Sequence, residues 1–231
     1  MKFICKKLKI TNNNDTLVDI DFEINKSFAL VGQSGSGKSL SLKALLGMLP
    51  ANLKYELDFS WNYPLEKGKT IVLVPQNPFT SLSPLTKIKD NFFTKDEQAK
   101  EFLKMVGLDP NLIYRFPSEL SGGQLQRIII AIALSHKPKI LLLDEPTTAL
   151  DSDSKKELLS LIKSLQESYQ FKILFVTHDI SSSKIICDKI GIIHKGKIIE
   201  KGDIGEVLKN PVKSYTKKLI ESSFENRKFR E

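Results

Sequence analysis

Short apolar runs alternate along the chain with stretches in which apolar residues recur every three or four positions. Residues 28–31, 140–143 and 173–176 are continuous apolar runs of strand length. Between such runs, leucine stripes at helical spacing predict helices, the clearest over residues 39–49, where Pro50 would end the helix. This alternation predicts an α/β fold with a covered, mainly parallel sheet.

Two regions depart from that alternation. Residues 52–74 alternate more like antiparallel strands and lead into a proline-rich turn. Residues 77–119 read as a small helical insert, in which a capping box formed by Thr94 and Glu97 would begin a helix and Gly107 would end it.

The C-terminal part of the sequence predicts a hairpin and a helix. Residues 190–200 indicate a hairpin that turns at Lys195 and Gly196. The segment from Pro211 onward is expected to be helical and then to fray over residues 227–231.

Composition narrows the class of protein. Of 231 residues, 41% are hydrophobic and 27% are charged, a globular balance, and no apolar run approaches the roughly 20 residues that span a bilayer. The N-terminus lacks an apolar segment long enough for a secretory signal, so we expect a soluble, cytosolic protein.

The cysteines, the histidines and the net charge do little to narrow the function. Cys5 and Cys187 lie far apart and predict reduced core thiols, and the three histidines lack metal-ligand spacing, so we expect no structural metal. The net charge of +8 suits a nucleotide, an anionic membrane surface or a nucleic acid. The lysines are scattered, however, and also fit a plain solvated surface.

A glycine-rich segment follows the first buried run and opens the first helix. It has the pattern GxxxxGK[ST], in which backbone N–H groups cradle phosphates. Lys38 is predicted to bridge the β- and γ-phosphates, and the Ser39 hydroxyl to ligate Mg²⁺. The predicted nucleotide-binding residues of this segment are Gly32, Gln33, Ser34, Gly35, Ser36, Gly37, Lys38 and Ser39.

Two acidic residues end the second buried run. Asp144 is the expected partner of Mg²⁺, and Glu145 is placed to act as the general base on the attacking water. Taken alone, the pair would read as a solvated strand end; the P-loop makes the catalytic interpretation the better one.

Residues 120–124 form a second candidate anion site. Ser121 can cap a helix, and Gly122 and Gly123 would let N–H groups approach a phosphate closely. Gln124 completes the Leu-Ser-Gly-Gly-Gln segment.

Together these motifs resemble the ABC ATPases, over nearly the whole chain. Six segments follow the family's order: Walker A, the Q-loop, the signature, Walker B, the D-loop and the switch histidine, here residues 32–39, Gln76, 120–124, 140–145, Ala149-Leu150-Asp151 and His178. The resemblance implies a P-loop NTPase (RecA-like) core with an antiparallel β subdomain and a small α-helical subdomain. It implies one domain, 1–231, with the helical subdomain at approximately 77–135.

The resemblance also implies roles for residues that the patterns alone leave open. Gln76 would contact Mg²⁺ or the lytic water, His178 the γ-phosphate, and Asp151 would belong to the nucleotide site. Each ATP would lie between the P-loop of one subunit and the signature of the other. Taken singly, His178 and Gln76 would read as ordinary strand-end and turn residues.

A narrower resemblance points to the ATP-binding subunits of peptide/nickel importers. It lies in residues 76–84 and 144–151, in Asn210-Pro211 and in Tyr215-Thr216. The short chain is more similar to the nickel-type subunits than to peptide-type members with long C-terminal extensions. The resemblance therefore implies an ATPase that drives uptake of nickel or oligopeptides, with nickel preferred.

The implied partners are transmembrane permease subunits, a second ATPase subunit, identical or paralogous, and indirectly an extracytoplasmic substrate-binding protein. The implied location is the cytoplasmic face of the inner membrane. Phe79, Leu82 and Leu85 could form part of a docking groove or pack in the core.

The alternative is a soluble ABC-type ATPase acting on nucleic acid or in chromosome maintenance. We expect no nucleic-acid partner. Such proteins carry long insertions or two ATPase domains, whereas 43 residues separate Gln76 from Leu120 here. A catalytically dead subunit would not need complete motifs, and a small-molecule kinase would not need the signature.

One departure from the family pattern concerns the base. The family stacks adenine on an aromatic residue about 20 positions before Walker A, but residues 10–14 contain none. We therefore expect weak discrimination between ATP and GTP.

Overall fold

The computed structural model describes residues 2–148 and 150–222, which divide into two compact units. One unit combines residues up to 65 with those from 172 onward, and the other holds residues 66–171. The C-terminal fraying predicted for residues 227–231 lies outside the described residues. Within the described part, no helix has the length and apolar character needed to cross a membrane.

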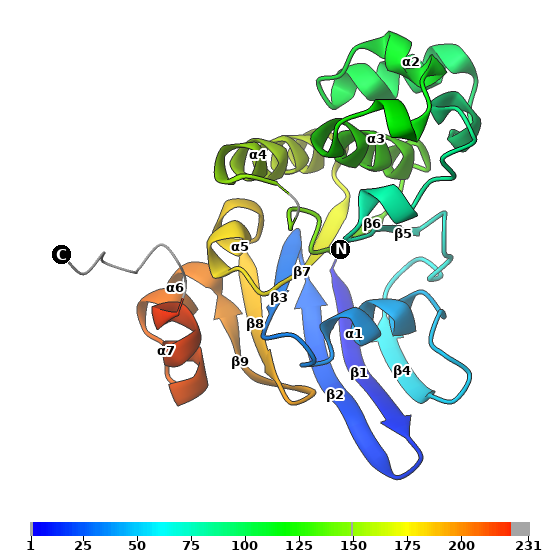
Figure 1. The fold of residues 1–231 in the computed structure, drawn as a ribbon. Coiled ribbons are helices and arrows are strands. Elements are labelled where there is room, and N and C mark those ends of the chain that lie inside the picture. Colours follow the sequence, from blue (N-terminus) through cyan, green and yellow to red (C-terminus); the bar gives the residue numbers. More distant parts are fainter. Residues whose placement is uncertain (1, 149, 223–231) are drawn as a thin grey trace, which may run out of the picture. The chain divides into compact units, whose positions relative to one another are not determined.

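The first unit contains an antiparallel sheet with the order β2-β1-β4 (Figure 1). Its strands are β1 (Phe3–Asn12), β2 (Asp15–Ile24) and β4 (Lys54–Ser60). On β2, alternate residues from Val18 to Ile24 are buried, so one face of the strand packs on the core.

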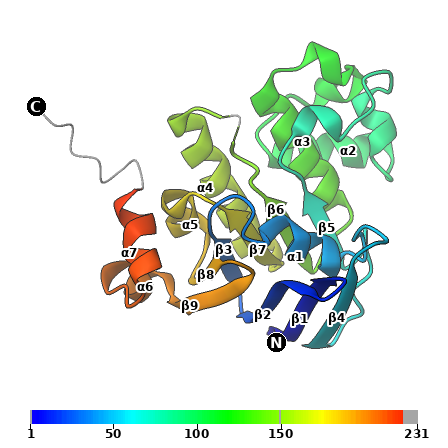
Figure 2. The same cartoon turned by 60° about the horizontal axis from the view of Figure 1, so that its bottom comes forward.

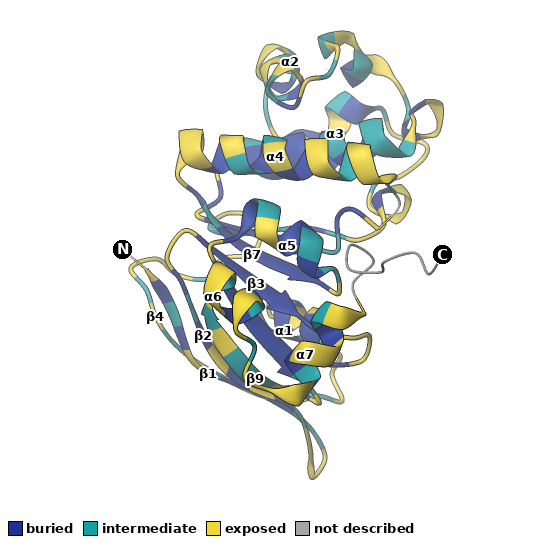
Figure 3. Ribbon diagram, turned by 90° about the vertical axis from the view of Figure 1, so that its left-hand side faces the viewer, coloured by how far each residue is buried: buried dark blue, intermediate teal, exposed yellow. Residues whose placement is uncertain are grey.

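The same unit holds strands paired in the order β7-β3-β8-β9, of which the first three are parallel. They are β3 (Ser27–Val31), β7 (Lys172–Thr177), β8 (Lys189–His194) and β9 (Lys197–Asp203). Strand β3 is buried at every residue, as Figure 3 shows, which explains its unbroken apolar sequence. The helices of this unit are α1 (Lys38–Leu45), α5 (Ile180–Ile186), α6 (Ile204–Lys209) and α7 (Ser214–Glu221).

The second unit is built around two parallel strands, β5 (Ile71–Val74) and β6 (Ile140–Asp144). Its helices are α2 (Asp96–Met105), α3 (Gly122–Ser135) and α4 (Ser152–Tyr169). Short 3₁₀ turns join them: η1 (Pro78–Thr80), η2 (Ile88–Asn91), η3 (Pro110–Tyr114) and η4 (Pro117–Glu119). Helix α3 is largely apolar and buried, and it packs against α2 and β5.

Three local predictions were wrong. Helix α1 ends at Leu45 rather than before Pro50, because Gly47 adopts a φ of 63°. The Gly47 N–H donates to the Ala44 carbonyl and the Met48 N–H to the Lys43 carbonyl, which together form a Schellman turn. Thr94 does not cap α2, whose N-cap is Lys95 without a side-chain bond. Strand β5 pairs with β6 in parallel rather than antiparallel. Its sequence is apolar throughout, which is typical of buried parallel strands.

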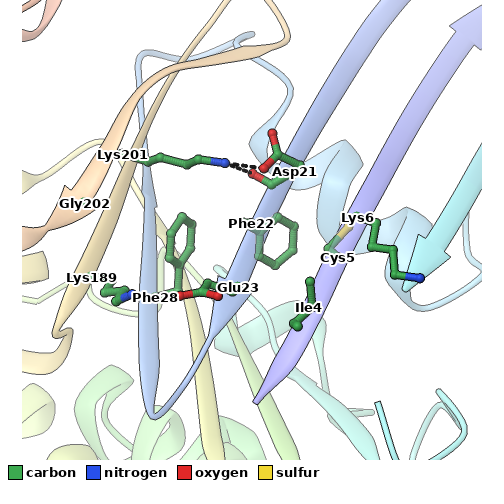
Figure 4. A pocket seen from close by; sticks show the side chains of 10 residues that line it. All are labelled: Ile4, Cys5, Lys6, Asp21, Phe22, Glu23, Phe28, Lys189, Lys201 and Gly202. Carbon is green, nitrogen blue, oxygen red and sulfur yellow. Dashed lines mark hydrogen bonds and ion pairs between the residues drawn. The ribbon is translucent and has the colours of Figure 1, made fainter. Parts of the chain in front are cut away.

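A cavity of about 340 Å³ in the first unit is framed by β1, β2, β8 and β9 (Figure 4). The Phe22 and Phe28 rings stack there at 5.4 Å, and Lys201 forms an ion pair with Asp21. Burial raises the pKa of the Cys5 thiol to about 12. Cys5 and Cys187 are both buried and are not joined in a disulfide, as predicted.

An ion pair at this cavity makes the stability of the first unit pH-dependent. The Glu23 carboxylate accepts hydrogen bonds from Lys189 at 2.8 Å and Lys2 at 2.7 Å, which lower its pKa from 4.5 to about 2. A depressed folded pKa stabilises the fold above the ordinary pKa, and this contribution is lost as pH falls from about 4.5 toward 2.

We therefore expect Glu23→Gln to lower the melting temperature at neutral pH. The difference from the wild type should close across that acidic window, as melting curves at a series of pH values would show. Glu56→Gln, which removes an exposed carboxylate on β4, is the control. A constant difference from pH 7 down to pH 3 would contradict the prediction.

Candidate functional site

The glycine-rich segment forms a tight loop between β3 and α1. Neighbouring atoms leave no room for a side chain at Gly32 or at Gly37. A Cβ on Gly32 would lie 2.3 Å from the Ile193 carbonyl oxygen. Gly37 has a φ of 105°, and a Cβ there would lie 2.6 Å from the Val18 side chain. The fold of the first unit therefore requires these glycines.

Lys38 lies inside this loop rather than in solvent. Its side chain is buried, and its ammonium donates hydrogen bonds to the Gly32 and Gln33 carbonyls at 2.8 and 3.0 Å. The Ser36 hydroxyl lies close to Gly32, is buried, and has no hydrogen-bond partner among the described residues. A buried cation and an unsatisfied hydroxyl within one loop of backbone N–H groups are the chemistry of an anion cradle.

The β8–β9 hairpin supports the loop from one side. The Gly196 N–H donates to the Ser36 carbonyl at 3.1 Å, and the Asp19 N–H donates to the Gly196 carbonyl at 2.7 Å. A Cβ on Gly196 would lie 2.1 Å from the Leu17 carbonyl. The sequence indicated only a hairpin turn at Gly196; its part in fixing the loop comes from contacts that no local pattern encodes.

His178 lies beside the loop because β3 and β7 are parallel and end together. Val31 pairs with Thr177, and the Gly32 N–H donates to the Thr177 carbonyl at 3.3 Å. Asp179, the next residue, caps α5 by accepting hydrogen bonds from the Ser181 N–H and the Ser182 hydroxyl. His178 is therefore held on the turn between a buried strand and a capped helix, with its side chain exposed.

The second unit repeats this arrangement with β5 and β6. Val74 pairs with Leu143, so Gln76 and the Asp144–Glu145 pair follow strands that end at the same edge. Glu145 has a φ of 47°, a left-handed conformation that costs a non-glycine residue about 1–3 kcal/mol. Such strain is typical of functional positions.

Residues 121–124 form the N-terminus of α3, as predicted. The Ser121 hydroxyl accepts the Gln124 N–H at 3.2 Å, and the Gln124 side chain accepts the Ser121 N–H at 3.0 Å. Unlike Gly32, Gly122 and Gly123 are not required by the fold, since a Cβ at either would meet Phe79 or Leu150 only at 3.6–3.8 Å. Packing within this unit therefore does not explain why both positions are glycine.

Asp151 caps helix α4. Its carboxylate accepts hydrogen bonds from the N–H groups of Asp153 and Ser154 and from the Ser154 hydroxyl at 2.7 Å. These bonds lower the pKa of Asp151, and the bond from the Ser154 N–H has the largest effect. Ala149, also predicted to belong to this motif, lies outside the described residues.

The predicted residues thus fall into two groups. The first unit brings together the loop over residues 32–39 and His178. The second unit holds Gln76, Asp144, Glu145, residues 121–124 and Asp151. No described cluster of three or more His, Cys, Asp or Glu residues could hold a metal by itself.

The hairpin that follows β1 bears on base recognition. Thr11 and Asn12 end β1, and β2 carries Leu17 and Val18. A Cβ on Gly196 of the β8–β9 hairpin would meet the Leu17 carbonyl oxygen, and one on Gly37 would meet the Val18 side chain. Residues 10–18 contain no aromatic side chain.

We expect dissociation constants for ATP and GTP within about tenfold of each other, because stacking on an aromatic ring, worth about 1–3 kcal/mol, is lacking. Thr11→Tyr should tighten ATP binding at least about fivefold, as isothermal titration would measure. A strong preference of the wild type for ATP over GTP would contradict this expectation.

Comparisons with known proteins agree with these motifs. The model of the family described as "ABC transporter" matches residues 16–148. The oligopeptide transport ATP-binding protein OppD of Bacillus subtilis is 34% identical, over 88% of this chain and 65% of its own length, so the chain spans about two thirds of that relative. OppF of Streptococcus mutans is 34% identical over 90% of this chain and 75% of its own length. The dipeptide transport ATP-binding protein DppD of Caldanaerobacter subterraneus is 35% identical over 89% and 71%.

Solved structures show the same fold. The dimeric ATP-binding cassette MJ0796 bound to ADP and phosphate aligns with a TM-score of 0.73 and 27% identity, over 88% of this chain and 99% of its own. The transporter component cbiO1 of Clostridium perfringens aligns with a TM-score of 0.74 and 25% identity, over 90% of both chains. The predicted fold class, a P-loop α/β core with antiparallel and helical parts, is confirmed. The family match and these relatives show that the chain belongs to the ABC transporter family, as an ATP-binding subunit.

Proposed function

We propose that this chain hydrolyses ATP to drive an importer for peptides at the cytoplasmic face of the cell membrane. The observation that supports the proposal is that the chain has two glycine-containing turns of different kinds, each before a helix. The loop over residues 32–39 is closed and internally braced, whereas Gly122 and Gly123 are bare although their own unit has room for side chains. A single chain needs one phosphate cradle, so the second is available to the nucleotide of another subunit.

This arrangement supports a head-to-tail dimer of ATPase subunits. The helix N-terminus at Ser121 offers N–H groups and a positive dipole end to an anion. The cassette MJ0796, a similar protein, is dimeric in its ADP- and phosphate-bound state. The second subunit is either a copy of this chain or a paralogue.

Within that dimer, Lys38 binds the phosphates. Its ammonium already lies desolvated inside the loop, so binding does not need to remove it from water. Glu145, held by a strained backbone, accepts a proton from the attacking water. His178, beside Gly32, contacts the γ-phosphate, Gln76 orients the water, and Asp151 rigidifies the start of α4.

The residues present also fit Mg²⁺. The ion prefers few protein ligands together with phosphate oxygens, and the chain offers hard oxygen donors in Ser39, Asp144 and Gln76 rather than a closed cage. When bound, the ion would neutralise charge on the triphosphate.

An apolar groove in the second unit is suited to a permease partner. It has a volume of about 420 Å³ and lies between β5, the segment after η1, and α3, with Pro75, Leu82, Ile129 and Ile132 among its lining residues. Phe79 and Leu85 are 56% and 87% exposed, so they do not pack in the core. An apolar groove, with large exposed apolar side chains close to its lining residues in the sequence, fits a helix from a membrane-embedded subunit.

Peptides are the substrate class that the relatives support. OppD, OppF and DppD are named for oligopeptide and dipeptide transport, and none of these three supports the preference for nickel drawn from chain length. A substrate-binding protein outside the cell would deliver the peptide to the permease.

Transport measurements test this proposal. The chain would be purified with the membrane subunits that accompany it, reconstituted into liposomes with the cognate binding protein, and supplied with ATP and either labelled peptides or ⁶³Ni²⁺. We expect ATP-dependent peptide accumulation and none with Glu145→Gln. Accumulation of nickel instead of peptide would overturn the substrate class, and the absence of ATP hydrolysis would overturn the proposed function.

A further inference from the structure

The C-terminal helix α7 reaches the phosphate loop through one side chain. The Tyr215 hydroxyl oxygen accepts a hydrogen bond from the Gln33 N–H at 3.4 Å. Its ring lies against the His194 imidazole, with 4.0 Å between ring centroids. His194 ends β8 directly before the hairpin turn whose Gly196 holds Ser36, so both contacts of Tyr215 fall on the loop or on its support.

A set of hydrogen bonds to Glu200 forms an anchor that fixes Tyr215 in this place. The Glu200 carboxylate of β9 accepts hydrogen bonds from the N–H groups of Val212 and Lys213 and from the Thr216 hydroxyl, at 2.8, 3.1 and 2.6 Å. These charge-assisted bonds satisfy donors at the start of α7, and Thr216 is fully buried. Because Thr216 is the next residue after Tyr215, the anchor also fixes the position of the tyrosine. Figure 1 and Figure 2 show α7 next to α6, on the β9 side of this unit.

We propose that Tyr215 is a positioning residue of the nucleotide site, through which α7 holds the start of the phosphate loop. Residues 33–35 are exposed, and Gly35 adopts a φ of 77°. Bonds within the loop, from the Ser36 N–H and the Lys38 ammonium, hold the Gln33 carbonyl, whereas the Tyr215 hydroxyl holds the Gln33 N–H from outside the loop. A tyrosine that fixes the Gln33 amide reduces the conformational entropy that the loop loses when phosphate binds. The inference rests on the proposed function of this loop as a triphosphate site.

The test is a comparison of the Tyr215→Phe variant with the wild-type chain. Phenylalanine keeps the ring against His194 and removes only the hydroxyl. We expect the dissociation constant for ATP to rise roughly two- to fivefold, because the variant loses one long hydrogen bond. The KM for ATP should rise by the same factor, whereas kcat and the melting temperature should not change. Tyr169→Phe, on α4, is the matched control and should bind ATP as the wild type does.

A double-mutant cycle tests whether the anchor acts through the tyrosine. Glu200→Gln should weaken ATP binding in the wild-type background and have little further effect in the Tyr215→Phe background. Wild-type affinity in Tyr215→Phe, or a fall in melting temperature that accounts for the change, would overturn the inference alone. If the wild-type chain does not bind ATP, the proposed function fails, and the inference fails with it.

Discussion

Replacing Glu145 by glutamine is expected to reduce the steady-state ATPase rate at least about a hundredfold while ATP binding is retained. Glutamine has nearly the same shape but cannot accept a proton, and a positioned general base contributes about 10²–10⁴-fold in rate. The backbone at this position already carries the strain of a φ of 47°, and glutamine bears it as glutamate does, so the fold should not change.

Two measurements separate this role from a structural one. Phosphate release under saturating ATP gives the rate, and light scattering with ATP present shows whether the variant accumulates as a dimer that cannot turn over. Glu167→Gln makes the same carboxylate-to-carboxamide change at an exposed position on α4, and it should alter neither the ATPase rate nor the dimer signal. A normal ATPase rate in Glu145→Gln would show that another group activates the water.

Replacing Lys38 by methionine is expected to weaken ATP binding by between about ten- and a hundredfold and to abolish measurable turnover. Hydrogen bonds to a charged group contribute roughly 1.5–3 kcal/mol each, and Lys38 already lies inside the loop with its charge shielded from water. Methionine keeps most of the apolar stem of lysine, so the loss should come from the ammonium group rather than from packing.

Lys43→Met is the matched control because Lys43 lies on the same helix and is exposed. Titration calorimetry with ATP and with ADP measures the effect, which should be larger for ATP if the ammonium contacts the γ-phosphate. Equal ATP affinity in Lys38→Met and the wild type would refute phosphate binding by this loop. Equal weakening by Lys43→Met would assign the effect to net charge.

Contiguous motifs were predictable because their chemistry is encoded by neighbouring residues. The phosphate loop needs a strand, glycines and a helix in immediate succession, and residues 32–39 supply them. The Ser121 cap likewise depends on a residue three positions away. The buried strands β3, β6 and β7 followed from unbroken apolar runs. Helix ends were less certain, since both Gly47 and Pro50 can stop α1 and only the structure shows that Gly47 does.

The sequence by itself therefore determined the fold class and most of the candidate site, because phosphate recognition and strand burial depend on short local patterns. Only the tertiary structure decided which strands pair, which glycines the fold requires, and what braces the loop. Gly196 lies 160 residues from Ser36, and Tyr215 lies 182 residues from Gln33. Contacts over such separations depend on how the strands and α7 pack together, and no periodicity along the chain records that packing.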